Sequence, residues 1–241
     1  MDEPKKRVTR LDAETDILHC KAIRHEYMRC YDAFELFASI GTDMVMEGHT
    51  NLKGYRAYNA YSNFILHLYE LYLALFARDL NVPSVSDSSQ IKRKVKRENK
   101  KRKKAGKDPI GVNYFTDPMI NEEVRRQAQA RLDDIDRGAA PSWENDRALY
   151  EGLLPPDPNF AKEFRELRNK IAGHVTYERI QDIKLTEFFH KYHFYLYLLY
   201  ETAGSWWGRH LDKPPEFGEV TDFLKAISKK RPDGGQDPSN A

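Results

Sequence analysis

Residues 64–76, FILHLYELYLALF, form the stretch of sequence that decides the fold. Apart from His67 and Glu70, every side chain in it is apolar or aromatic. A helix that is apolar on nearly every side has to be surrounded by other elements of the protein or by a partner. The stretch is also too short to cross a bilayer. We therefore expect it to lie in the central helix of a bundle, within a helix from about Leu52 to Leu80.

Helical patterns continue on both sides of this stretch. Apolar residues recur every three or four positions from about Thr15 to Ile40, and an aromatic face runs from about Asp182 to Trp207. Asp117-Pro118 and Asp157-Pro158 each place a capping aspartate before a proline, which predicts two further helix starts. No segment alternates as a strand does. The sequence thus predicts an all-α, up-and-down helical bundle with an inserted basic and polar segment.

The 241 residues suit a single domain. We expect four parts: a first helical hairpin over 14–83, a basic and partly helical insertion over 84–156, a second hairpin over 157–230, and a disordered tail over 231–241. The first ten residues, MDEPKKRVTR, are not followed by an apolar run, so we expect no secretory signal and no membrane partner. The two cysteines, Cys20 and Cys30, are too far apart on one helix to pair, and a reducing, cytoplasmic location is expected.

Charge is distributed unevenly along the chain. Eleven Lys or Arg and one Glu lie between Lys92 and Lys107, so this segment has a net charge of +10. The whole chain has a net charge of +2, so the remainder stands at about −8. Lysine and arginine neutralise nucleic-acid phosphates, so the run is a candidate RNA-binding arm that would attract without reading sequence. The alternatives are a mobile, solvated insertion or a nuclear-import-like patch. The candidate RNA-binding residues here are Lys92, Arg93, Lys94, Lys96, Arg97, Lys100, Lys101 and Arg102.

The segment from Arg168 to His174, RNKIAGH, carries the candidate chemistry. It resembles the RxxxxH-type motif of the HEPN superfamily, which allows four to six residues between Arg and His and often has Asn directly after the Arg. The motif covers seven residues, and the order of long helices extends the similarity loosely to most of the chain. The resemblance implies a bundle of four to five helices and a metal-independent ribonuclease of toxin–antitoxin or antiviral systems.

The residue types suit RNA cleavage. The reaction deprotonates the 2′-hydroxyl, protonates the leaving 5′-oxygen and stabilises a charged phosphorane. Histidine titrates near neutral pH and can transfer these protons, whereas arginine presents a charged, planar fork to phosphate oxygens. We therefore predict that Arg168 stabilises the phosphate charge, His174 transfers protons and Asn169 orients one of the two. No metal or cofactor is expected.

A single Arg–His pair does not conveniently supply both an acid and a base. Two-fold symmetry would bring two pairs into one cleft, and the resemblance likewise implies a composite site, so we predict a homodimer. Five intervening residues place Arg168 and His174 about 120° apart on an ideal helix, so Gly173 is expected to break or bulge the helix. Downstream, Tyr177 and Arg179 are further candidate phosphate contacts. A neutralising antitoxin or a regulatory protein is a possible additional partner.

Three functional hypotheses remain open from the sequence. The first is an endoribonuclease that acts as a toxin or defence effector. The second is a non-catalytic, HEPN-like regulatory module that binds RNA or protein. The third is a helical scaffold with a basic arm, in which Arg168 is a surface residue and His174 only caps a helix end.

Overall fold

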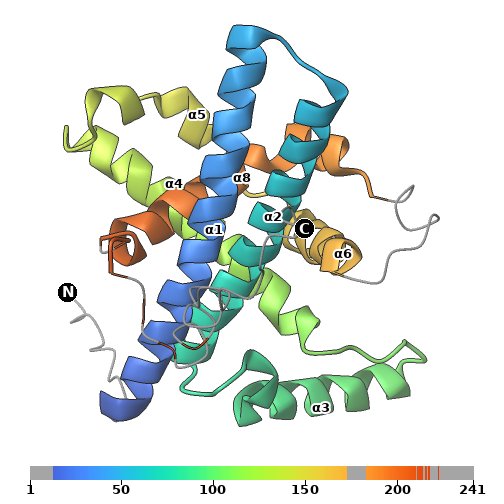
Figure 1. Cartoon of the computed structure of the whole chain (residues 1–241). Helices are drawn as coiled ribbons and strands as arrows, with labels where there is room; N and C mark the ends of the chain where they lie inside the picture. The colour runs from blue at the N-terminus through green and yellow to red at the C-terminus, as the bar shows by residue number, and fades with distance from the viewer. Residues whose placement is uncertain are drawn as a thin grey trace, which may run out of the picture.

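The computed structural model describes residues 13–172, 183–209, 211–213, 215, 217 and 222. In these residues the chain is an all-α helical bundle without a strand, which confirms the predicted fold class (Figure 1). The α-helices are α1 (Ala13–Glu47), α2 (Asn51–Asp79), α3 (Ser89–Lys104), α4 (Asn113–Asp136), α5 (Arg147–Glu151), α6 (Phe160–Ala172) and α8 (Leu185–Trp207). Two 3₁₀ turns, η1 (Val85–Asp87) and η2 (Ser142–Glu144), lie between them.

Helix α2 is the central helix of the bundle, as its sequence predicts. Its residues between Ala60 and Ala77 are buried on most sides, and α1, α6 and α8 pack around it. Thr50 caps the start of the helix, because its hydroxyl accepts a hydrogen bond from the Lys53 amide at 3.2 Å. No helix in the described part of the chain has both the length and the apolar character that a membrane span requires.

Aromatic rings join α1 and α2 to α8. Helices α1 and α2 lie side by side, and α8 runs obliquely behind them (Figure 1). Phe34 of α1 packs against Phe64 of α2 and Tyr200 of α8, with ring centroids 5.0 and 4.6 Å away. The hydroxyl of Tyr72, a fully buried side chain, donates to the Leu199 carbonyl at 2.9 Å, which satisfies its one polar atom.

Helix α4 begins earlier than the sequence predicts. The expected start at Asp117-Pro118 is wrong: α4 begins at Asn113, and Pro118 lies inside it. Asp117 does not cap a helix because its carboxylate binds the Arg165 guanidinium on α6. Thr116, one residue before, is buried in the core, so tertiary packing extends the helix past the local signal.

Helix α6 begins at Phe160, two residues after the second Asp-Pro pair. The Asp157 carboxylate accepts hydrogen bonds from the Asn159 amide at 2.8 Å and from the Tyr192 hydroxyl at 3.0 Å. These bonds, the Asn159 amide foremost, hold the pKa of Asp157 below its usual value. The aspartate therefore fixes the N-terminal end of α6 against α8.

His193 of α8 makes the stability of the bundle depend on pH. Its ring stacks on Phe189 at 4.6 Å, and its Nδ1 lies 3.0 Å from the Tyr61 hydroxyl. Burial lowers the pKa of His193 below its ordinary value. The unfolded chain therefore binds the proton more tightly, and the free energy of unfolding falls as the pH drops from about 6.5 to the lowered pKa of the folded state.

We expect the His193→Gln variant to lose less stability than the unchanged protein when the pH is lowered from about 7.5 to about 5.5, because glutamine keeps a polar group but does not titrate. Urea denaturation at both pH values measures this difference. His190→Gln, an exposed change on the same helix, is the control and should behave like the unchanged protein. Identical pH dependence in all three proteins would contradict the assignment to His193.

Candidate functional site

Helix α6 has one face buried in the core and one polar edge. Phe160, Ala161, Phe164 and Leu167 are buried against the core, and the Phe164 ring meets Tyr69 of α2 edge-on at 5.1 Å. This packing fixes the rotation of α6 about its axis. Arg165, Arg168 and Asn169 are consequently placed together on one edge, because residues three and four apart share a helix face.

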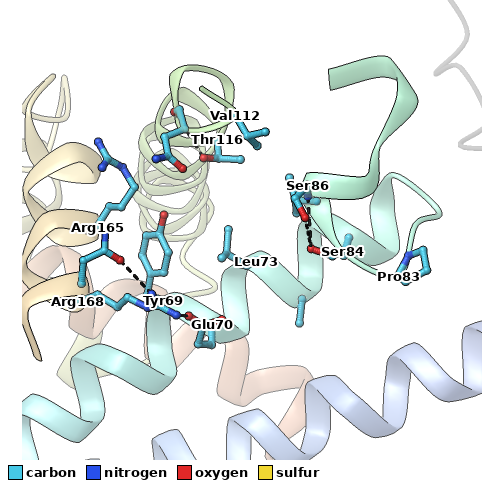
Figure 2. A pocket seen from close by; sticks show the side chains of 15 residues that line it. Tyr69, Glu70, Leu73, Pro83, Ser84, Ser86, Val112, Thr116, Arg165 and Arg168 are labelled. Atoms are coloured by element: carbon cyan, nitrogen blue, oxygen red, sulfur yellow. Dashed lines mark hydrogen bonds and ion pairs between the residues drawn. The ribbon is translucent and has the colours of Figure 1, made fainter. Parts of the chain in front are cut away.

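This edge of α6 lines a pocket of about 490 Å³ (Figure 2). Arg165 and Arg168 lie on one side of it, Ser84 and Ser86 lie across from them, and α2 passes beneath. Two of the three predicted catalytic residues, Arg168 and Asn169, thus line one hollow with several other polar groups. Its remaining lining residues are Tyr69, Glu70, Leu73, Ala74, Ala77, Pro83, Val85, Val112, Asn113 and Thr116.

The Arg168 guanidinium is held by contacts on two sides. One Nη donates to the Glu70 carboxylate of α2, and the other donates to the Asn169 side-chain oxygen at 2.9 Å. The guanidinium carbon lies 5.8 Å from the centre of the Tyr69 ring. Its Nε is buried and has no hydrogen-bond partner among the described residues. Since a guanidinium carries five N–H donors, Arg168 keeps donors for an anion while it remains bound to Glu70.

Arg165 forms the second anchor of the pocket wall. Its Nε and Nη2 donate to the two carboxylate oxygens of Asp117, each at 3.0 Å, and both side chains are mostly buried. These hydrogen bonds to the Asp117 carboxylate raise the pKa of Arg165. Burial raises the pKa of the nearby Tyr69 to about 12, so its hydroxyl stays neutral. Arg165 and Tyr69 therefore both keep their protons at neutral pH.

The first turn of α4 also faces the pocket. Asn113, the first residue of α4, and Thr116 line the hollow, and no side chain caps this helix end. The N-terminus of a helix carries partial positive charge, which favours an anionic ligand. Two arginines and the hydroxyls of Ser84 and Ser86 line the same hollow, so the pocket offers hydrogen-bond donors beside the Glu70 carboxylate.

The remainder of the predicted motif lies outside the described residues. Helix α6 ends at Ala172, directly before Gly173, where the sequence predicts an interruption. His174, Tyr177 and Arg179 are among the residues that the structure does not describe. Their placement relative to Arg168 therefore remains a prediction.

The basic run forms the ordered helix α3. All eight candidate RNA-binding residues from Lys92 to Arg102 lie on it, and seven of them are exposed. The eighth, Arg102, is half-buried and donates from Nε to the Asp108 carbonyl at 2.6 Å. Helix α3 follows directly on η1, whose residues line the pocket, so the two predicted parts of the site are neighbours in the chain.

Four residues were not identified as site residues from the sequence. Tyr69, Glu70 and Arg165 line the pocket, and Asp117 binds Arg165 from behind the lining. Glu70 carried a usable signal, because a charge inside an otherwise apolar central helix requires a partner. Arg165 also carried one, since it precedes Arg168 by three positions on the same helix face. For Asp117 there was no such indication in the sequence, because an aspartate directly before a proline predicts a helix cap and not an ion pair.

Comparisons of the chain with protein-family models, with curated proteins and with solved structures found no match. Within the described ranges, no three or more His, Cys, Asp or Glu side chains gather in a metal-binding arrangement. The functional argument therefore rests on the residues of the pocket and of α3.

The Asp117–Arg165 pair should stabilise the pocket wall measurably. We expect Asp117→Asn to lower the free energy of unfolding by about 1–3 kcal/mol, because the buried guanidinium loses a charged acceptor. The control is Glu122→Gln on the same helix, whose solvent-exposed pair with Arg125 should contribute much less to stability. Urea denaturation measures both, and equal losses would contradict the anchoring role.

Proposed function

We propose that this chain is a metal-independent endoribonuclease that cleaves RNA by attack of the 2′-hydroxyl on the adjacent phosphate. One observation carries the proposal. Arg168 and Asn169, the described part of the motif, line a pocket that offers guanidinium and hydroxyl donors, beside a helix with nine exposed cations. A phosphodiester is the ligand that suits both features.

Arg168 is the residue that binds the reacting phosphate. The attack of the 2′-oxygen on phosphorus forms a phosphorane whose additional negative charge the guanidinium stabilises at short range. Glu70 and Asn169 hold Arg168 in place before the substrate arrives, so little reorganisation is needed during the reaction. The P–O5′ bond then breaks, which leaves a 2′,3′-cyclic phosphate and a 5′-hydroxyl.

Proton transfer is assigned to His174. It accepts the 2′-hydroxyl proton or delivers a proton to the 5′-oxygen, and its ordinary pKa near neutrality suits both tasks. Because one histidine serves one of the two oxygens, we propose that a second copy of the chain supplies the other. A toxin or antiviral defence effector is the proposed biological role.

A cleavage assay in excess EDTA tests the proposal. We expect RNA to be cut with 2′,3′-cyclic phosphate ends and the matching 2′-deoxy strand to stay intact. Arg168→Ala and His174→Ala should each slow cleavage by at least about 100-fold, because each removes a group that acts in the transition state. Gel analysis of end-labelled RNA measures the rates.

Lys162→Ala is the matched control, since Lys162 is an exposed cation on the same helix that does not line the pocket. It should cleave like the unchanged protein. Cleavage unaffected by either active-site variant would refute the assignment. A folded protein that binds RNA without cutting it would instead support a non-catalytic, HEPN-like binding module.

A further inference from the structure

Helix α3 is fixed to the protein along its inner side. Ile91 is buried, and Val95 packs against the core one turn later. Asn99, a further turn along, exchanges two hydrogen bonds with the Ile110 backbone: its Nδ2 donates at 2.9 Å and its Oδ1 accepts at 2.7 Å. Ser88 caps the helix start by accepting from the Ile91 amide. The orientation of α3 is therefore set by its contacts.

The outer side of α3 is almost entirely cationic. Lys92, Arg93, Lys94, Lys96, Arg97, Lys100, Lys101, Lys103 and Lys104 are all exposed. Within the described part of the chain, only two of these nine cations form ion pairs: Lys92 with Asp87, and Lys101 with Glu98. Like charges four residues apart on a helix repel each other. This outer face therefore costs stability in the free protein, and a bound polyanion would relieve that cost.

Both ends of the α3 segment return to the candidate site. Ser84 and Ser86, just before the helix, line the pocket, and so do Val112 and Asn113 after the returning loop. Helix α3 itself lies at the periphery of the bundle (Figure 1). Its 16 residues extend over about 24 Å. A ligand that covers this face and also reaches the pocket must therefore be a long polyanion.

The chemistry of the outer face selects among polyanions. It carries no aromatic residue, and aromatic rings are what single-strand binders use to stack bases. Its cations follow one another along the whole helix, so they can contact many phosphates at once. A double helix presents phosphates at high density because it carries them on two strands. Its two apolar residues, Ile91 and Val95, face inward, so none remains to insert into a lipid surface.

We propose that the outer face of α3 binds the phosphate backbone of a double-helical RNA segment next to the strand that enters the pocket. The proposal deepens the proposed nuclease function by naming structured RNA as the substrate class. Binding is independent of sequence, because lysine and arginine contact the backbone of A-form RNA and not its bases.

The test measures binding with RNA that cannot be cleaved, so its outcome is separate from that of the cleavage assay. Fluorescence anisotropy is recorded with a fully paired hairpin and an unpaired strand of equal length, both 2′-O-methylated. We expect the hairpin to bind at least about tenfold more tightly, because the paired backbone presents more charge to α3. Changing the hairpin sequence should leave its affinity unaltered.

The variant K96Q/K100Q/K103Q removes three charges from the outer face. We expect it to reduce the slope of log affinity against log salt concentration by about 3, one for each lost phosphate contact. The control R125Q/K162Q/K184Q removes three exposed cations from α4, α6 and the start of α8, and it should keep most of the slope. Circular dichroism checks that both variants remain helical.

Three results would overturn the proposal. The unpaired strand could bind as tightly as the hairpin, which would exclude recognition of duplex RNA. The two triple variants could lose affinity equally, which would show general charge attraction without a role for α3. Finally, vesicles with phosphatidylserine could bind in an α3-dependent way while the hairpin does not, which would identify a membrane surface as the partner.

Discussion

The ion pair between Arg168 and Glu70 is the constraint on which the candidate site depends. Glu70 belongs to the central helix, where a carboxylate is stable only if a cation or several donors accompany it. Arg168 supplies that cation from α6, and the burial of Phe164 and Leu167 on the same helix fixes its direction. The core of the bundle therefore determines where Arg168, the proposed phosphate-binding residue, points. Such preorganisation is what stabilisation of a charged transition state requires.

The proposed recognition of RNA and the proposed chemistry depend on different charged residues. In the pocket, Arg165 is paired with Asp117 and Arg168 with Glu70, so the charges there nearly cancel and the pocket acts through directed hydrogen bonds. The outer face of α3 carries an excess of cations on an otherwise acidic chain. Because fields between exposed charges are screened beyond about 8 Å at physiological salt, α3 attracts an anion only near its own surface. Under the proposal, the direct connection of α3 to the pocket rim places the attracted RNA next to the pocket.

The helical class, the central place of α2 and the long aromatic α8 could be predicted from the sequence, because each follows from the periodicity of side chains within one segment. The placement of Arg168 and Asn169 in a shared pocket was consistent with the predicted motif. The start of α4 could not be predicted, since Asp117-Pro118 reads locally as a cap and only Arg165, 48 residues later, shows its actual role. Glu70 and Arg168 are 98 residues apart, and their contact depends on how α2 and α6 cross. The order of α3 was signalled only by Ile91, Val95 and Asn99 at four-residue spacing.

The most direct test of the site follows the Nε–H of Arg168, a buried group without an acceptor among the described residues, as a reporter on its guanidinium. Its NMR resonance, assigned with Arg168→Lys, is followed while a 2′-deoxy dinucleotide is added. The account predicts a saturable shift of the Arg168 resonance, whereas Arg165, held by Asp117, and exposed Arg125 change little. An Arg168 resonance that stays fixed, or that shifts no more than Arg125, would contradict phosphate binding in this pocket.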